Sequence, residues 1–208
     1  MKKLLFLAAV CVLGLTANAQ TEKGNVLLGG SVFYTRLSND AAVSKITAIQ
    51  IMPSAGYFVK DNFALGLGLG YWHAKYDYGQ GSQVAIDNGI KDREFSIRPF
   101  ARYYKSVNNQ FKFFGNLSVP IHFGENTRGG SDTRIAEQTI KTNGFGIEFS
   151  PGFAFFPTPK IGIEFSIPGI SYTNSNYKLN AGTDYEGNKE FKIGGDLASP
   201  TIGIQFYF

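Results

Sequence analysis

Hydrophobic and small or polar residues alternate with a period of two over eight stretches of the chain. The clearest stretch is the C-terminus, where Ile202, Ile204 and Phe206 occupy one face and small or polar residues occupy the other. A period of two places successive side chains on opposite faces of a β-strand. The pattern predicts strands over residues 24–37, 44–59, 63–70, 94–103, 112–123, 144–155, 161–168 and 201–208.

The two faces of these strands differ in size and charge. One face carries Phe, Ile, Leu and Val, whereas the other carries mostly Gly, Ala and Ser with few charges. A soluble sandwich or lipocalin would present a well-charged face to water, while a membrane barrel turns its bulky face to lipid and its smaller face inward. The pattern therefore predicts an all-β fold, a transmembrane up-and-down antiparallel β-barrel. A soluble periplasmic β-domain is the alternative.

The connections between the predicted strands alternate in length. Residues 38–43, 78–91, 125–137 and 174–190 form the longer ones, and residues 60–62, 106–110 and 157–159 form the short ones. Outer-membrane barrels have short periplasmic turns and longer external loops. Seven alternating connections join eight strands, and an even number of strands places both termini of the chain on the periplasmic side. A ten-stranded barrel would need two more strands within the longer connections.

The first nineteen residues have the organisation of a secretory signal peptide. Lys2 and Lys3 precede an uncharged run over residues 4–15, and Ala17-Asn18-Ala19 forms an A-x-A cleavage site before Gln20. The apolar run is too short to span a bilayer as a helix, which needs about 20 residues. We expect residues 1–19 to be cleaved, leaving residues 20–208 as the barrel domain.

The amino-acid composition further limits the class of protein. The chain has 19 Phe, 11 Tyr and 25 Gly in 208 residues, which is unlike a helix bundle rich in Ala, Leu, Glu and Lys. The one cysteine, Cys11, lies in the predicted signal, where a lipoprotein signal is the alternative interpretation. Loss of Lys2 and Lys3 lowers the net charge from +4 to +2. No basic run remains, so we expect no nucleic-acid partner.

Six charged residues are predicted to point into the barrel: Glu94, Arg98, Arg102, Lys112, Glu148 and Glu164. Buried charges are costly unless they are paired. An eight-stranded barrel is just wide enough for side chains to fill it. We therefore predict that these residues form a lumen charge network that plugs the barrel. A gated ion path, or small diffusion channel, is the alternative.

The candidates for catalysis and metal binding are few. His73 and His122 are the only histidines, and no metal-binding spacing accompanies them. His122 is predicted to face inward with Ser and Glu on neighbouring strands, a combination that some barrel enzymes use to deacylate lipid A. A catalytic triad is defined by geometry, and no motif supports one here. We predict no catalytic residue, cofactor or metal, and keep a lipid-modifying enzyme with His122 or His73 as base as the alternative.

Several segments resemble the porin-family, OmpA-like or OmpX-like small barrels of the outer membrane. They are the signal ending at Gln20, the turn and strand over residues 58–68, the strand over residues 98–104 and the C-terminal residues 204–208. The resemblance covers essentially the whole mature chain and implies an eight-stranded barrel in the outer membrane of a Gram-negative cell. Ile204, Phe206 and Phe208 look like the C-terminal signal for the barrel-insertion machinery.

The resemblance also implies partners but no single activity, because similar barrels serve as anchors, adhesins, pores or enzymes. The partners it implies are outer-membrane lipid and lipopolysaccharide, the barrel-insertion machinery and periplasmic chaperones. We predict an integral outer-membrane protein with a structural or surface-interaction role, whose external loops contact partners.

Overall fold

The computed structural model describes residues 21–39, 44–78, 90–128, 138–179, 184–194 and 201–208, which are organised as one antiparallel sheet of eleven segments. The segments are β1 (Val26–Asn39), β2 (Ser44–Lys60), β3 (Phe63–Tyr78), β4 (Ile90–Ser106), β5 (Phe111–Ser118), β6 (Ile121–Arg128), β7 (Gln138–Thr158), β8 (Ile161–Ser166), β9 (Ile170–Leu179), β10 (Asp184–Ile193) and β11 (Thr201–Tyr207). These described residues include no helix long and apolar enough to cross a membrane.

The eleven segments make eight strands. β5 and β6 continue one another across residues 119–120, and β8 and β9 do so across residues 167–169. Pro120 and Pro168 lie in these two interruptions, where proline has no N–H to give to the ladder. β10 and β11 form the eighth strand, because they pair with β9 and β8 respectively. The predicted eight-stranded antiparallel barrel is confirmed.

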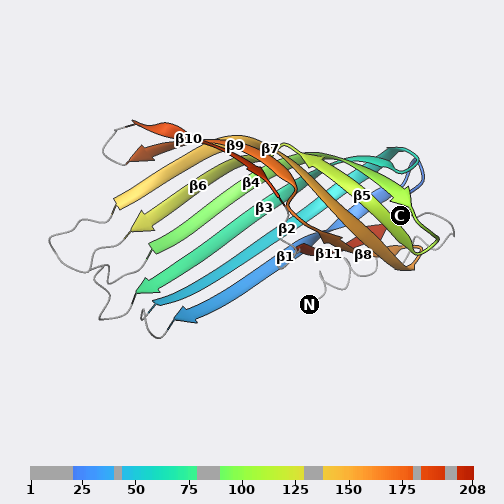
Figure 1. Ribbon diagram of the computed structural model, residues 1–208, viewed down its shortest axis with the longest axis horizontal. Helices are drawn as coiled ribbons and strands as arrows, with labels where there is room; N and C mark the ends of the chain where they lie inside the picture. The colour runs from blue at the N-terminus through green and yellow to red at the C-terminus, as the bar shows by residue number, and fades with distance from the viewer. Residues whose placement is uncertain (1–20, 40–43, 79–89, 129–137, 180–183, 195–200) are drawn as a thin grey trace, which may run out of the picture.

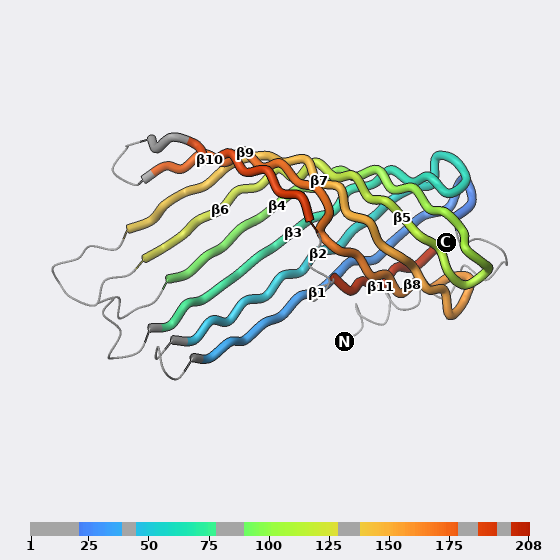
Figure 2. The backbone as a smooth tube through the Cα atoms, viewed as in Figure 1, coloured from blue at the N-terminus to red at the C-terminus, as the bar shows by residue number. Residues whose placement is uncertain are grey.

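The sheet closes on itself at one end. β11 pairs with both β1 and β8, and β8 pairs with β7, which completes a ring of eight strands. We call this end, which carries the short connections near residues 61, 108 and 159, the turn end. The opposite end, where the strands run toward residues 40–43, 79–89 and 129–137, is the loop end (Figures 1 and 2).

In the half toward the loop end, which we call the open half, the described residues show no pairing between the first and the eighth strand; residues 195–200 of the eighth strand lie outside them. The pairing of β1 with β11 stops at Ser31 and Gly203. Among the described residues, β1 beyond Ser31 pairs only with β2, and β10 pairs only with β9. Figure 1 shows β1 and β10 at opposite margins of the sheet there. We call the region between residues 32–39 of β1 and β10 the seam.

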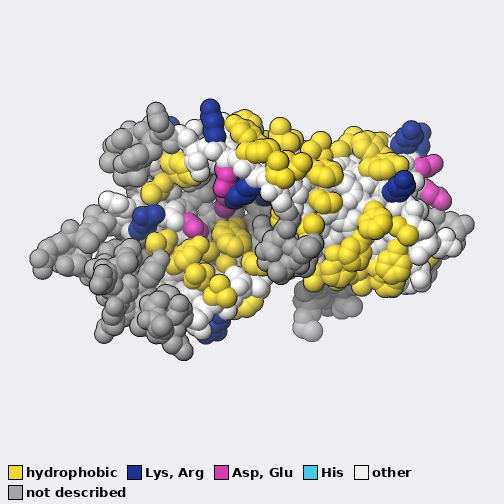
Figure 3. All heavy atoms as spheres, in the orientation of Figure 1, with side chains coloured by type: hydrophobic (Ala, Val, Ile, Leu, Met, Phe, Trp, Pro, Cys, Tyr) yellow, Lys and Arg dark blue, Asp and Glu magenta, His cyan; other side chains and the backbone are white. Residues whose placement is uncertain are grey.

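The outward face carries an apolar belt. On β3, Leu65, Leu67 and Leu69 are 43–47% exposed, while the inward Ala64 is fully buried. The outward apolar positions of β3 run over residues 63–71, about 27 Å along a strand. At a tilt of about 40° this covers roughly 20 Å along the barrel axis, close to the ~25 Å apolar band of membrane barrels. Hydrophobic side chains are spread over the half of the barrel toward the turn end in Figure 3. We call it the closed half, because each of its strands pairs with two neighbours.

Two of the predicted connections are wrong in extent. The sequence predicts a loop over residues 174–190, but β9 reaches Leu179 and β10 begins at Asp184. β6 similarly continues to Arg128, inside the connection predicted over residues 125–137. Both faces of the chain are polar there, so the alternation that marks a strand in lipid is lost. The middle of each longer connection lies outside the described residues.

Candidate functional site in the barrel interior

The most buried ion pair among the described residues lies on the inner wall of the closed half. Nη1 of Arg102 on β4 donates to Oε2 of Glu164 on β8 at 2.6 Å, and the two side chains are 12% and 5% exposed. The hydroxyls of Tyr104 and Tyr207 donate to the second oxygen, Oε1, at 2.8 and 3.0 Å. Glu164 therefore accepts three hydrogen bonds, as a buried carboxylate requires.

The Arg102 guanidinium is also engaged on its other sides. Nε donates to Oδ1 of Asn116 at 3.0 Å, and Nη1 donates to the Tyr104 hydroxyl at 3.3 Å. Its Cζ atom lies 4.7 Å from the ring centroid of Phe114, a favourable cation–π distance. The cluster thereby ties together β4, β5, β8 and β11.

Large buried side chains fill the barrel at the turn end. Their rings contact one another at centroid distances of 5.1–6.5 Å. We call this set the turn-end plug: Leu27, Phe58, Ala64, Tyr104, Phe114, Ala154, Phe156 and Tyr207. Each member is at most 5% exposed, so side chains occupy the lumen there, as expected for eight strands.

The described N-terminal segment covers the same end. Thr21 is 3% exposed, and its carbonyl oxygen accepts a hydrogen bond from the backbone N–H of Asn62 at 2.6 Å. Nζ of Lys112 donates to the Thr21 hydroxyl at 2.6 Å, and lies 5.7 Å from the ring of Phe156. Asn62 adopts a φ of 62°, a left-handed conformation that asparagine tolerates in tight turns. This turn holds the N-terminal segment against the plug.

A second ion pair lies nearer the loop end. Nη1 of Arg98 donates to Oε2 of Glu148 at 2.6 Å, and Nε of Arg98 donates to Ser96 at 3.3 Å. These two side chains are 21% and 29% exposed, so water reaches this pair more readily than it reaches Arg102 and Glu164. Both pairs border one cavity.

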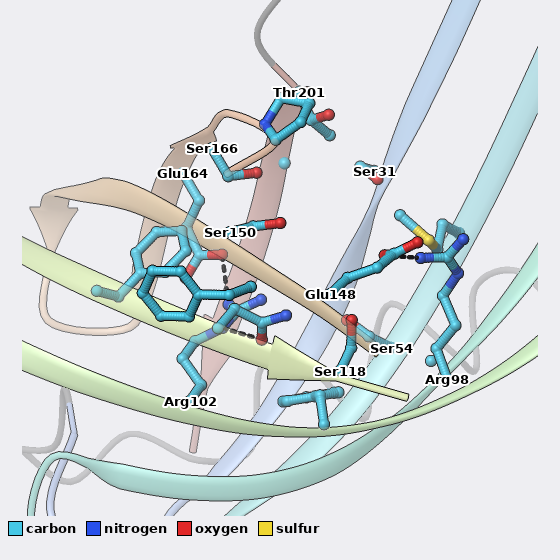
Figure 4. A pocket seen from close by; sticks show the side chains of 18 of the residues that line it. Ser31, Ser54, Arg98, Arg102, Ser118, Glu148, Ser150, Glu164, Ser166 and Thr201 are labelled. Atoms are coloured by element: carbon cyan, nitrogen blue, oxygen red, sulfur yellow. Dashed lines mark hydrogen bonds and ion pairs between the residues drawn. The ribbon is translucent and has the colours of Figure 1, made fainter. Parts of the chain in front are cut away.

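The cavity has a volume of about 320 Å³ and lies where the closed half meets the open half. Figure 4 shows the hydroxyl-bearing side chains that surround it together with the two ion pairs. They are Ser31, Ser54, Ser118, Ser150, Ser166 and Thr201, which the figure labels, and Ser171. In Figure 3, acidic and basic side chains are visible in a hollow between hydrophobic ones. The cavity can therefore offer many neutral hydrogen-bonding groups, with its charges already neutralised in pairs.

The structure brings four of the six predicted lumen residues into the two ion pairs. Lys112 lies apart from them at the turn end, where its Nζ donates to Thr21 and, among the described residues, meets no carboxylate within ion-pair distance. Glu94 is half-buried on β4, nearer the loop end. Within the described part of the chain its side chain makes no ion pair or hydrogen bond.

The C-terminal residues follow the predicted alternation. Ile204 and Phe206 point outward and are 52% and 38% exposed. Phe208 follows the end of β11, and its backbone exchanges two hydrogen bonds with Val26, at 2.8 and 2.9 Å. The last strand is thus joined to the first at its final residue. Recognition of these residues by the insertion machinery remains a prediction.

His122 lies on the inner wall and contacts a serine. Its Nε2 is 3.0 Å from Oγ of Ser175 on β9, and both residues are 8% exposed. Nδ1 of His73 lies 3.2 Å from the carbonyl oxygen of Asp92. Nucleophilic catalysis needs a base that a third group orients. In the described residues no carboxylate is hydrogen-bonded to His122. Within the same residues, no three His, Cys, Asp or Glu side chains are grouped to hold a metal ion.

Sequence reasoning did not single out the tyrosine hydroxyls or Ser175. Tyr104 lies near a predicted strand end, which is typical of an aromatic residue at the membrane interface, yet it belongs to the plug and its hydroxyl bonds Glu164. Its position two residues after Arg102 puts both on the inward face of β4. This two-residue spacing is the feature of the sequence that could have identified Tyr104 as an inward-facing residue.

Comparisons with known proteins agree with this architecture. The family model for the outer membrane protein beta-barrel domain matches residues 5–198. Among solved structures, the chain is similar to the outer membrane protein OprG from Pseudomonas aeruginosa, with 13% identity and a TM-score of 0.55 over 92% of this chain and 99% of that one. It is also similar to a major outer membrane protein from Thermus thermophilus, with 12% identity and a TM-score of 0.52 over 90% of this chain and 100% of that one. No curated protein matches the chain.

Proposed function

Because the chain belongs to the outer membrane protein β-barrel domain family, we propose that it is a non-conducting, non-catalytic barrel that anchors surface-exposed hairpins in the outer membrane. In such barrels the short turns lie in the periplasm and the longer loops outside the cell. The turn end is accordingly periplasmic and the loop end external. In this proposal the hairpins at the loop end contact partners outside the cell, and the turn end seals the barrel.

The turn-end plug is the observation that carries this proposal. Its aromatic rings occupy the interior across the closed ring of strands, and Arg102 and Glu164 neutralise each other beside it. Thr21 and Lys112 add a further layer at the periplasmic end. An ion crossing the barrel would have to displace these buried groups, whose removal from their partners is costly.

Planar-bilayer recordings test the seal. We expect the wild-type protein to give no discrete conductance steps, whereas the double variant Tyr104→Ala/Tyr207→Ala, which removes two rings and two hydroxyls from the plug, gives small steps. The matched control is Tyr57→Ala/Tyr103→Ala, since these tyrosines are 49% and 56% exposed on the outside of the same end. Steps of equal size in wild-type protein and both variants would contradict a sealed lumen.

The strands extend well beyond the apolar belt at the loop end. β2, β4 and β7 contain 17, 17 and 21 residues, whereas a tilted strand crosses the hydrocarbon core in about 9–11. Above the belt the outward positions become mainly basic: Lys45, Lys75, Lys91, Arg93, Lys141 and Lys178. We call these six residues the basic collar. The collar would lie at the height of the phosphate-bearing head groups of the outer leaflet.

Two cross-strand pairs in the collar join like charges. Lys75 lies opposite Lys91, and Lys141 lies opposite Lys178. Two outward carboxylates offset part of this charge, since Oδ1 of Asp77 lies 2.6 Å from Nζ of Lys75 and Glu125 lies opposite Arg93 and Lys141. The six basic residues outnumber them, so the collar stays net positive and attracts anions. The collar therefore fits a phosphorylated lipid such as lipopolysaccharide.

Lipopolysaccharide binding to the protein in nanodiscs tests the collar. We expect Lys75→Gln/Lys91→Gln to weaken binding severalfold at low salt, and less at high salt, because the attraction is screened. Lys60→Gln/Lys105→Gln makes the same charge change at the periplasmic end, where both lysines are exposed. Equal weakening by both variants would show that net charge, and not the collar, governs the interaction.

A further inference from the structure

The side-chain amide of Gln205 lies at the cavity with an unpartnered oxygen. Gln205 of β11 is 4% exposed and borders the cavity, and its Oε1 atom has no hydrogen-bond partner among the described residues. Buried polar atoms without a partner are rare in folded proteins. The terminal torsion of a glutamine side chain is broad, so the amide can present either its oxygen or its nitrogen to a ligand. It offers an acceptor and two donors.

Small residues separate this amide from Arg98 on the inner wall. Gln205 lies opposite Gly29, which lies opposite Ser54, and Gly68 links Ser54 to Arg98 in the same row of the sheet. A side chain on Gly29 would collide with Oε1 of Gln205, so the amide extends over Gly29 along this row. The row therefore leaves space for a ligand between the amide and the guanidinium.

The ion pair at the other end of the row has hydrogen-bonding groups left over. Arg98 uses Nη1 to bond Oε2 of Glu148 and Nε to bond Ser96. Nη2 of Arg98 and Oε1 of Glu148 make no further bond within the described residues. An acceptor beside a donor fits two neighbouring hydroxyls, one donating to the carboxylate and the other accepting from the guanidinium. The pair is thus suited to a vicinal diol.

Three polar side chains lie between the two ion pairs. In the ladder of β5 and β7, Ser118 lies opposite Glu148, and Ser150 lies opposite Asn116 (Figure 4). The hydroxyls of Ser118 and Ser150 make no hydrogen bond within the described part of the chain. Asn116 accepts from Arg102 through Oδ1, which leaves its Nδ2 as a donor. These groups can bond further hydroxyls of the same ligand.

The charges that border the cavity cancel in pairs. Arg98 with Glu148, and Arg102 with Glu164, each have an N–O distance of 2.6 Å. An ionic ligand would bring a further charge into a partly buried site without a counter-charge, which is costly. The described wall therefore favours an uncharged ligand that is held by hydrogen bonds.

Apolar side chains form the rest of the lining. Phe100 packs over Gly66, where any side chain would collide with the ring, and Met52 and Phe149 also border the cavity. Ligand sites typically combine an apolar lining with a few oriented polar groups. The C–H faces of a sugar ring suit the first and its hydroxyls the second. A volume of about 320 Å³ lies at the lower end of the range for small-molecule sites, which suits a single ring.

We propose that the cavity binds one uncharged monosaccharide. Two neighbouring hydroxyls of the sugar bond Glu148 and Arg98, and hydroxyls on the other side of the ring bond Ser150 and the amide of Gln205. The C–H face of the ring lies against Phe100. The cavity is on the loop-end side of the turn-end plug, so failure of sugar binding would leave the sealed lumen unaffected.

The experiment is a sugar titration of the full mature chain in nanodiscs, followed by nuclear magnetic resonance of 15N-labelled glutamine side chains. Gln205 and Gln50 border the cavity, whereas Gln110 is exposed at the turn end and is the internal reference. The probes are D-glucose, D-galactose and D-mannose, which differ in the orientation of single hydroxyls, and the uronate of each. We expect at least one neutral sugar to shift the signals of Gln205 and Gln50 saturably, without a shift of Gln110.

Two results would overturn the proposal. If the shifts of Gln205 rise linearly and in parallel with those of Gln110 for all three neutral sugars, the cavity holds only water. If a uronate binds as tightly as its neutral sugar, the ligand is not selected for the absence of charge.

Variants test whether the cavity is the site. Gly68→Val places two methyl groups in the row between Gln205 and Arg98, and the Cβ position of Gly68 meets neighbouring atoms only at 3.6 Å or more. We expect this variant to lose saturable binding. Gly124→Val is the matched control, because Gly124 does not border the cavity and its nearest contact is 3.4 Å. A heat-dependent gel shift verifies folding, and saturable binding to folded Gly68→Val protein would overturn the site.

Gln205→Met tests the amide without a change in side-chain length. We expect it to weaken sugar binding about tenfold, as for the loss of one or two hydrogen bonds, with the signal of Gln50 as the readout. Unchanged affinity in this variant would overturn the role of Gln205, whether or not Gly68→Val folds.

Discussion

The two halves of this barrel use similar residues with different degrees of burial. At the turn end every strand has two neighbours, and the pair of Arg102 and Glu164 is 12% and 5% exposed. Toward the loop end the pair of Arg98 and Glu148 is 21% and 29% exposed. Every described side chain of β10 from Gly187 onward is exposed. One ion pair is therefore part of a seal, and the other borders an accessible cavity.

The environment explains why the halves can differ. In hydrocarbon an open sheet edge leaves backbone groups unsatisfied, so a membrane-spanning sheet must close. Above the apolar belt, water or polar head groups can satisfy a free edge. The described pairing between the first and the last strand lies within the apolar belt and ends, at Ser31 and Gly203, near its upper margin. Closure is therefore demanded of the part of the wall that lies in hydrocarbon and not of the part above it.

The largest expected difference between the halves is in stability. Glu164→Gln removes the negative charge that neutralises Arg102 and leaves a buried cation unpaired. We expect a loss of about 3–5 kcal/mol in the free energy of unfolding, as for other broken buried pairs. Urea unfolding from lipid vesicles, followed by the heat-dependent gel shift, measures it.

Glu148→Gln is the matched change in the more accessible pair. Water can solvate the remaining Arg98, so we expect a loss of only about 1 kcal/mol. Similar losses for the two variants would mean that the two pairs experience the same environment. The comparison between a sealed and an accessible half would then fail.

Amide hydrogen exchange rates along β1 compare the closed half with the open half within a single strand. Val26 is hydrogen-bonded to Phe208 of the last strand, so by alternation the amides of Val32, Tyr34 and Arg36 point into the seam. Those of Phe33 and Thr35 point toward β2. We expect the seam-facing amides to exchange on the order of 100-fold faster, equivalent to about 2.7 kcal/mol of protection.

Nuclear magnetic resonance of the protein in nanodiscs resolves these amides individually. The amide of Leu28, which faces the same side but lies in the closed half, is the internal reference and should exchange slowly. If Val32 and Tyr34 are as protected as Leu28, the seam is closed in the membrane. The two halves would then be closed alike.

The sequence predicted the closed half better than the open half. Lipid imposes alternation on strands that cross it, so Leu65, Leu67 and Leu69 identify a strand and its outward face directly. Beyond the belt both faces are polar, and the hairpin of β9 and β10 was therefore mistaken for a loop. The point at which the described pairing of β1 with β11 ends, at Ser31 and Gly203, has no signal in the pattern, because alternation does not show which distant strands pair or over what length.

The residues of the candidate site were also predicted only in part. The alternation predicted that Arg102 and Glu164 face inward. Their ion pair could not be predicted, because the sequence does not show which strands face each other across the lumen. The hydroxyls of Tyr104 and Tyr207 were missed because tyrosine near a strand end is equally typical of a membrane interface. Lys112 was assigned to the charge network only because the alternation placed it on the inward face. Its hydrogen bond to Thr21 depends on where the N-terminal segment lies.

The smallest expected effect concerns the pair of His122 and Ser175. A Cβ atom on Gly144 would lie 2.6 Å from Nε2 and 2.9 Å from Cε1 of His122, so the ring packs closely against the backbone of β7. Without an orienting carboxylate among the described residues, His122 is poorly placed to activate Ser175. We expect His122→Ala to leave the lipid A profile of the outer membrane unchanged. The stability loss should be about 1 kcal/mol, for one buried hydrogen bond.

Mass spectrometry of lipid A from cells expressing wild-type protein, His122→Ala and His73→Ala measures the first effect. His73 is the matched control, since its ring nitrogen lies beside the backbone oxygen of Asp92 and not beside a hydroxyl that it could activate. Loss of a deacylated species with His122→Ala but not with His73→Ala would reverse the assignment. The inner wall of the open half would then be a catalytic surface, and the contrast between the halves would be one of chemistry as well as of closure.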